Sequence, residues 1–503
     1  MSSSPSQADD APIGAKAKRP ALEQDVKAIE SQHFEGQTQK PFTTLSAMSI
    51  GANTTNSAIG VILTLSIWLP YGGPAFTVYS YLAMALVGTA TAISLSELAS
   101  AMPDAGGQYI WVAKLSPARC RRFLSYLTAL ISWAGAVCTG ASATLACPEL
   151  AVALAEFLNP GVQVPSWQVF VGYQAVNWLS VVPGLFESVI PRMGKFMMFY
   201  TLFVLVFIFI GLFAASKERQ PTSVVFTGFS NDTGWPAGVA VLIGMNSPNW
   251  CFSCLDTIVH IAEEVPNPRK NLPKAIMWTI PIGLITGLLV LLSGLFNMDD
   301  SGTQSSYFQI AYAAFGSSTS AAIAVQVLIF MSAFSAQAHI HIWQSRLAWT
   351  IGINHGFPFD TYLSKIVGAP FHTPVWATLF SALWTTLLGV VYVGSKVAFS
   401  SLISCGILFQ YISYSIPVIL LLAKGRSVEH GPFWLCRTGL VANIAMICWT
   451  VLATVIYSLP YTLPADIDTM NYVSVIICGF MLLIVAIWFG VARKRWTVPH
   501  LTG

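Results

Sequence analysis

The chain has 503 residues, of which 54% are hydrophobic and only 9% charged, whereas soluble domains carry about 25% charged residues. So few charges cannot cover the roughly three soluble domains expected for this length, and the composition therefore excludes a soluble protein. A net charge of +3 without a large basic cluster also excludes nucleic-acid binding. The chain is expected to lie mostly in a lipid bilayer.

The first predicted element is a disordered cytosolic tail over residues 1–42. This segment is polar and mixed in charge, and it lacks the apolar core and cleavage site of a signal peptide. A second short cytosolic tail is expected over 496–503. The nine cysteines lie mostly in apolar runs and are expected to be buried as small hydrophobes, without disulfides. Cys251 and Cys254 lack a second pair at zinc spacing, so neither a metal nor a cofactor is expected.

Between these tails, the transporter-like domain over 43–495 contains apolar stretches of about 20 residues. Such stretches predict membrane-spanning α-helices, because in hydrocarbon every backbone polar group must bond within its own segment. We predict an all-α integral membrane protein with twelve such helices. Their continuous apolarity, without alternation, excludes a membrane β-barrel. The predicted ranges are 44–69, 75–98, 122–146, 165–185, 196–216, 236–262, 274–296, 320–343, 375–393, 397–422, 435–459 and 471–492.

The basic residues predict the orientation of these helices, because cytoplasmic loops carry an excess of Lys and Arg. With both termini in the cytoplasm, all of the 25 Lys and Arg residues except Lys217, Arg219 and Lys396 fall on the cytoplasmic side. We expect this orientation in the plasma membrane. Asn231, in the sequence Asn-Asp-Thr, then lies in an external loop and is a candidate glycosylation site.

Two of the predicted helices, the first and the sixth, are interrupted by polar and helix-breaking residues, at 51–57 and 246–253. Such residues are tolerated at membrane depth only where the backbone faces protein or a watery cavity. Transporters built from inverted repeats place broken helices at matching positions. We therefore predict one repeat over about 44–216, a second over about 236–422, and two extra helices over about 435–492. A single interruption would also fit a kinked helix.

Two stretches of the sequence resemble a known family. They are SLSELASAMPDAGGQYIWVAKLSP, from Ser94 to Pro117, and NWCFSCLD with the following HIAEEVPNP, within 249–268. Both are similar to signatures of the fungal amino acid/choline transporters in the amino acid-polyamine-organocation superfamily. The resemblance covers residues 44–495. It implies a leucine-transporter-type core of five plus five inverted helices, and uptake of choline, γ-aminobutyrate (GABA) or another amino acid, typically with protons.

The breaks in the two helices are the expected substrate site, because unwound backbone offers free N–H groups to anions and free carbonyls to cations. An aromatic face there attracts an ammonium by about 0.5 to 2 kcal/mol. The alternatives are that the polar side chains satisfy the unwound backbone locally and that the aromatic side chains only fill the core. The candidate substrate-binding residues are Asn53, Thr54, Asn56, Asn249, Trp250, Phe252 and Ser253.

Asp256 and His260 are the candidate proton-coupling residues. Ionisable groups are rare within membrane helices, and these two lie one helical turn apart on the same face. A buried carboxylate beside a histidine that titrates near neutral pH is the chemistry of a proton relay. The alternatives are a structural pair, or a gate closed by Arg269 or Lys270.

Other ionisable and polar residues are expected near the two ends of the helices. Glu149 and Glu156 are placed toward the outer end of the third helix, in a vestibule or in solvent. The glycines of Asp-Ala-Gly-Gly before Gln108 favour a tight re-entrant turn at the inner end. The candidate gate residues at that end are Glu97, Gln108, Glu263 and Glu264.

The sequence thus predicts a secondary active transporter that works by alternating access, with the first and sixth helices moving against the third, fourth, eighth and ninth. Its expected partners are a small amine or amino acid, protons and the lipid bilayer. One alternative is a transporter-like nutrient sensor. Another is an intramembrane enzyme, which is disfavoured because no nucleophile with a matched base and no phosphate-binding loop is present; its candidate residues would be His339, His341, Asn354 and His355.

Overall fold

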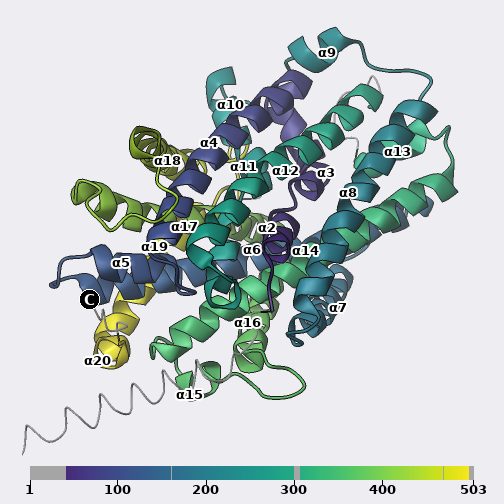
Figure 1. Cartoon of the computed structure of the whole chain (residues 1–503). Helices are drawn as coiled ribbons and strands as arrows, with labels where there is room; N and C mark the ends of the chain where they lie inside the picture. Colours follow the sequence, from purple (N-terminus) through teal and green to yellow (C-terminus); the bar gives the residue numbers. More distant parts are fainter. Residues whose placement is uncertain (1–40, 160, 299–305, 468–469, 498–503) are drawn as a thin grey trace, which may run out of the picture. The chain divides into compact units, whose positions relative to one another are not determined.

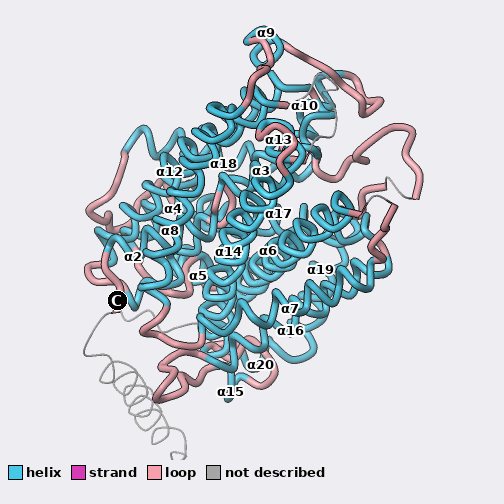
Figure 2. The backbone as a smooth tube through the Cα atoms, turned by 90° about the vertical axis from the view of Figure 1, so that its right-hand side faces the viewer, coloured by secondary structure: helices cyan, strands magenta, loops and turns pink. Residues whose placement is uncertain are grey.

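The computed structural model describes residues 41–159, 161–298, 306–467 and 470–497. The predicted tails over 1–42 and 496–503 therefore lie almost wholly outside the described residues. Within those residues the regular secondary structure is helical and no strand forms (Figure 2); an isolated β-bridge joins Val367 and Thr373. The expectation of an all-α membrane protein is confirmed.

The helices are joined by connections of varied length (Figure 1). The first part of the chain forms α2 (Thr44–Thr55), α3 (Ser57–Trp68), η1 (Leu69–Tyr71), α4 (Gly73–Ala101), α5 (Gln108–Leu115), α6 (Arg121–Leu158), α7 (Ser166–Gly184), α8 (Ile190–Ala215), α9 (Thr222–Thr227), α10 (Ala237–Gly244), α11 (Asn246–Cys251) and η2 (Leu255–Glu264). The second part forms α12 (Pro268–Asn297), α13 (Tyr307–Ala314), α14 (Thr319–Ile353), α15 (Asp360–Leu363), α16 (Val375–Gly394), α17 (Lys396–Ala423), α18 (Cys436–Ile456), α19 (Val473–Ile487), η3 (Trp488–Ala492) and α20 (Arg493–Arg495).

Each of the twelve predicted ranges falls on helical structure. Among the described residues, ten helical segments are long and apolar enough to cross a membrane. The two predicted ranges that do not meet this criterion are α7 and the sixth range, which is divided into α10, α11 and η2. A count of twelve spans therefore stays a prediction.

The first predicted break lies at Asn56, between α2 and α3. Asn56 adopts the left-handed conformation, with φ 34° and ψ 56°, and asparagine is one of the few residues other than glycine that tolerates it. The backbone N–H of Asn56 still donates to Ala52, and its carbonyl accepts from Gly60. The chain therefore changes direction at a single residue.

The second break covers Phe252–Cys254, the C-terminal end of the predicted interruption and the residue after it. Cys254 has φ 64°, and a 3-10 helix, η2, follows it. The preceding residues form α11 although they include Pro248, because a proline in the first turn removes only an N–H that has no partner within the helix. The interruption is thus shorter than the sequence predicts.

The helices fall into two groups of neighbours, and the broken helices belong to the second group. In one group α6, α7, α14 and α16 contact one another. In the other, α12 contacts α4, α2 and α3, and α3 contacts α11. The first group corresponds to the third, fourth, eighth and ninth predicted helices, which the sequence analysis assigned to the static part.

Candidate functional site

The two helix breaks are in contact with each other. The hydroxyl of Thr55 donates to the carbonyl of Ser253 at 3.1 Å, which joins the last residue of α2 to the second break. On the other side of the first break, α3 packs closely on α11, because a Cβ on Gly60 would lie 2.8 Å from Sγ of Cys251. The two breaks therefore lie side by side, and a shared substrate site stays a prediction.

A cavity of about 320 Å³ lies between α3, α6, α11 and α17. Trp250, on α11, lines it, and it is the one predicted substrate-binding residue that does so. Asn246 also lines the cavity and donates to the hydroxyl of Ser404 at 3.0 Å. We call this space the outer cavity, because its lining residues lie on the halves of these helices that the sequence analysis places outside.

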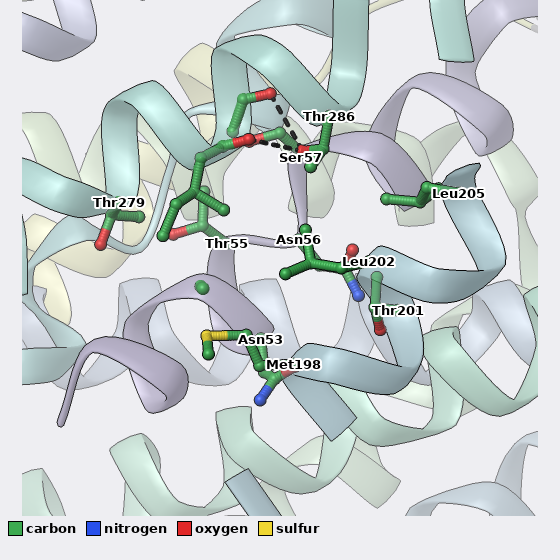
Figure 3. A pocket seen from close by; sticks show the side chains of 13 residues that line it. Asn53, Thr55, Asn56, Ser57, Met198, Thr201, Leu202, Leu205, Thr279 and Thr286 are labelled. Atoms are coloured by element: carbon green, nitrogen blue, oxygen red, sulfur yellow. Dashed lines mark hydrogen bonds between the residues drawn. The ribbon is translucent and has the colours of Figure 1, made fainter. Parts of the chain in front are cut away.

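A second, water-sized cavity of about 20 Å³ lies at the first break, facing α8 and α12 (Figure 3). Asn53 and Asn56 line it, and their side-chain amides donate to the carbonyls of Gly194 at 2.7 Å and Ser332 at 3.4 Å. These bonds hold the unwound segment against α8 and α14. The space is large enough for about one water molecule.

The other four predicted substrate residues are turned toward protein partners. Thr54 donates to the carbonyl of Ile50, one turn back in α2. The amide of Asn249 donates to the hydroxyl of Tyr457 at 3.0 Å, and the ring of Phe252 lies 4.9 Å from that of Tyr81. The hydroxyl of Ser253 donates to the carbonyl of Trp250. These contacts are of the kind expected if the side chains satisfy and pack the local structure.

Asp256 and His260 lie in contact, fully buried in η2. Nε2 of His260 is 3.2 Å from Oδ2 of Asp256. The same oxygen accepts from Nε2 of Gln108 at 2.7 Å, and Oδ1 accepts from the hydroxyl of Tyr414 at 2.6 Å. Gln108, predicted as a gate residue, is thus a direct partner of the proton-coupling candidate.

The hydrogen-bond partners of the two ring nitrogens indicate where His260 and Asp256 carry protons. Nδ1 of His260 lies 2.7 Å from the carbonyl of Ala105, and because a carbonyl can only accept, Nδ1 carries a hydrogen. The contact between Nε2 and Asp256 then requires one further proton, either on the imidazole or on the carboxyl. A proton between Nε2 and Oδ2 would make this contact a hydrogen bond.

A chain of hydrogen bonds joins this pair to the second helix break. The hydroxyl of Tyr414 is 3.2 Å from Oε1 of Gln410, which accepts from the backbone N–H of Cys254 at 2.8 Å. Nε2 of Gln410 donates to Thr139 on α6 at 2.8 Å. Sequence reasoning missed Gln410, although a glutamine in an otherwise apolar predicted helix is a signal that could have identified it.

The predicted gate residue Glu264 is paired with Arg346 on α14. The carboxylate accepts from Nε at 3.0 Å and from the second guanidinium nitrogen at 3.3 Å, and the Arg346 side chain is only 3% exposed. Arg269 instead contacts Glu429 and the end of α4, and a gating role for these residues stays a prediction. Glu263 is exposed on the same 3-10 helix.

Glu97 is fully buried and anchors the segment between α17 and α18. Its carboxylate accepts from Arg426 at 2.9 Å and from the backbone N–H of Leu435 at 2.8 Å. The guanidinium of Arg426 in turn lies 4.5 Å from the ring centre of Trp434. Glu97 thus ties α4 to the C-terminal helices.

The residues considered for an enzyme do not converge on one site. His339 bonds to the carbonyl of Ser335 at 2.7 Å, and His355 bonds to Asp360 at 2.8 Å. Among the described residues, no group of three His, Cys, Asp or Glu side chains is arranged to hold a metal ion. At the predicted glycosylation site, the amide of Asn231 donates to the carbonyl of Trp235 at 2.7 Å, and modification there stays a prediction.

The chain is similar in sequence to a known protein family and to individual proteins in it. The family model described as "Amino acid permease" matches residues 42–483. The chain is 44% identical to a swainsonine transporter, swnT, of Arthroderma benhamiae, over 94% of this chain and 95% of that protein. It is 34% identical to a choline transporter of Saccharomyces cerevisiae, over 95% of this chain and 86% of that protein.

Among solved structures, the crystal structure of MhsT in complex with L-phenylalanine is similar, with a TM-score of 0.56. The match covers 82% of this chain and 98% of the MhsT chain, at 14% sequence identity. At that identity, the similarity concerns the fold alone.

Proposed function

Because the chain belongs to the amino acid permease family, whose model matches it over residues 42–483, we propose that it imports a small organic amine by proton-coupled alternating access. Family membership makes it a multi-pass transmembrane transporter and not an enzyme. Its fold is the leucine-transporter type, as the sequence resemblance implied. The substrate, the coupling ion and the location are the proposed parts.

The proposed substrate is supported by the relatives and by Trp250. The two relatives are named for transport of swainsonine and choline, and both compounds are organic amines. Trp250 lines the outer cavity directly before the second break. An aromatic face in such a partly desolvated site stabilises an ammonium by about 0.5 to 2 kcal/mol.

Proton coupling is supported by the contact between Asp256 and His260, which a shared proton would make a hydrogen bond. Without that proton, a carboxylate oxygen and a ring-nitrogen lone pair would face each other at 3.2 Å, which is repulsive. Separation of the pair would also disturb Tyr414 and Gln410, and through them the backbone of Cys254. Loss of the proton would thus change the hydrogen bonds that hold the backbone at the second helix break.

The side from which the substrate would enter is inferred from which end of the helix assembly is closed. The inner end carries the buried Glu264–Arg346 pair and the occluded Asp256–His260 pair, while the outer cavity leads to Trp250. The substrate would enter from the outer cavity, and proton transfer at the inner pair would accompany opening of that end. We place the transporter in the plasma membrane with both termini cytoplasmic, as the distribution of basic residues indicates.

The test is uptake of radiolabelled choline and GABA by proteoliposomes that contain the full chain, with and without an inward proton gradient. Asp256→Asn should abolish accumulation driven by the gradient, at least tenfold, because the shared proton can no longer be released. Exchange of labelled for unlabelled substrate should stay within twofold, which shows that the variant is folded. Gradient-driven accumulation at the wild-type level in Asp256→Asn would contradict the proposed coupling site.

A further inference from the structure

We propose that Glu149 makes the outer cavity a site for organic cations and so determines the charge of the solute that this chain accepts. The inference rests on the proposed function, which it makes specific: a cationic amine should be preferred to a zwitterion, and a zwitterion to an uncharged molecule of the same shape. The sequence analysis placed Glu149 only in a vestibule or in solvent.

Glu149 shares one face of α6 with the cavity wall. Ser142, Leu145, Ala146 and Glu149 all line the cavity and are spaced three or four residues apart, which places them on one side of the helix. Glu149 is exposed in the described structure. Its carboxylate is therefore accessible from the cavity.

The lining of the outer cavity carries only negative charge. Glu149 is the one charged side chain among the residues that line it, and all of those residues lie within the described ranges; none of them is Lys or Arg. Lys396, at the start of α17, acts on Glu149 only across a distance beyond salt-bridge contact. Its ammonium instead lies 5.8 Å from the ring centre of Tyr392.

Glu149 differs in this respect from the carboxylates at the inner end. Glu97 and Glu264 each bind an arginine, and Asp256 binds Gln108 and Tyr414. In the part of the chain that the structure describes, the carboxylate of Glu149 has no salt bridge or hydrogen bond of this kind. A cationic ligand in the cavity would supply the missing opposite charge.

Aromatic groups complete the site for a molecule with both an ammonium and a polar group. Trp250, Tyr71 and Tyr461 line the same cavity, and such rings attract quaternary and primary ammonium ions. The indole N–H of Trp250 is buried and has no acceptor among the described residues. Recognition of a polar group of the ligand would fall to hydroxyl side chains that line the cavity, such as those of Ser247 and Ser404.

The experiment measures equilibrium binding of radiolabelled choline to the purified full-length chain, with competition by 3,3-dimethyl-1-butanol, the uncharged carbon analogue of choline. The wild type should prefer choline by at least about tenfold, since a carboxylate–ammonium interaction near a protein surface has that magnitude. Glu149→Gln should weaken choline binding about tenfold and leave binding of the analogue within twofold. Glu149→Asp, which keeps the charge, should restore most of the preference.

Glu156→Gln is the matched control, because Glu156 is a glutamate on the same helix that does not line the cavity. It should bind choline within twofold of the wild type. The proposal is overturned if Glu149→Gln keeps the wild-type preference, if Glu156→Gln loses as much, or if the wild type binds no organic cation. If binding depends on Glu149 but proteoliposomes show no transport, this inference stands and the proposed function fails.

Discussion

The carboxylates at the two ends of the helix assembly differ in whether the protein supplies them with a charge partner. At the inner end, carboxylates are buried against specific donors, as in the Glu264–Arg346 and Glu97–Arg426 pairs. At the outer end, Glu149 faces a cavity with no opposite charge on its lining. At the inner end the protein's own arginines neutralise the carboxylates, whereas at the outer end we propose that a cationic ligand does so.

The inner closure depends on the close approach of the segment between α4 and α5. Gly107 has φ 54°, and a Cβ there would lie 3.0 Å from both Cε1 of His260 and Val259. Glycine is the residue that adopts this conformation without strain, and here it also leaves room for the imidazole. The neighbouring carbonyl of Ala105 then holds Nδ1 of His260.

At the inner end, removal of Arg346 is expected to have the largest effect on stability. Arg346→Gln leaves the largely buried Glu264, whose side chain is 13% exposed, without its charge partner, which should cost up to about 3 kcal/mol. Arg269→Gln is the control, because its ion pair with Glu429 is exposed, and such pairs contribute about 0 to 1 kcal/mol. Thermal unfolding of the purified protein in detergent should show a much larger loss for Arg346→Gln. Equal losses would mean that burial does not distinguish these pairs.

Substitution of Trp250 tests how the outer cavity recognises a cation. If its ring attracts the substrate ammonium, Trp250→Phe should retain more affinity for choline than Trp250→Leu, with a total loss of about 0.5 to 2 kcal/mol. Competition binding measures both variants. Equal weakening by the two substitutions would show that the Trp250 ring does not contribute a cation–π interaction.

The smallest expected effect concerns pH at the inner end. Burial alone would raise the pKa of Asp360, but hydrogen bonds from His355 and Thr361 and the charge of Arg495 lower it below its usual value. A carboxyl with a lowered pKa in the folded state stabilises the protein above about pH 4, and this stabilisation is lost as pH falls through the folded pKa.

Asp360→Asn should therefore lower stability at pH 7 by at most about 1 kcal/mol, since the partner Arg495 is 44% exposed. The difference from wild type should begin to shrink below about pH 4, where the carboxyl of Asp360 takes up a proton in the unfolded state, and should vanish as pH falls through the lower folded pKa. Thermal unfolding at pH 7 and pH 3.5 compares the two proteins. A difference that is the same at both pH values would contradict the assignment.

Much of this architecture could be predicted from the sequence because it depends on local signals. Apolar runs mark the helices, and the polar segment around Asn56 marks the first break. The helical spacing of Asp256 and His260 places them on one face, and the structure brings them into contact. The second break is shorter than predicted, because Pro248 fits into the first turn of α11.

The partners of these residues could not be predicted, because they come from distant parts of the chain. Arg426 is 329 residues from Glu97 in sequence, and Arg346 is 82 residues from Glu264. Which arginine reaches a carboxylate depends on how the helices pack, and no local pattern records it. The same applies to Gln410, whose role appears only where α17 meets the second break.

The burial of Glu97 has a consequence for protein engineering. Its two donors, Arg426 and the N–H of Leu435, both come after α17, outside the ten helices of the inverted repeats. A chain shortened to those ten helices would leave this carboxylate buried and unpaired, and we expect it to misfold. Fusion tags and fluorescent reporters should therefore be attached beyond Arg495, and the last two helices should be kept in any minimal version of the transporter.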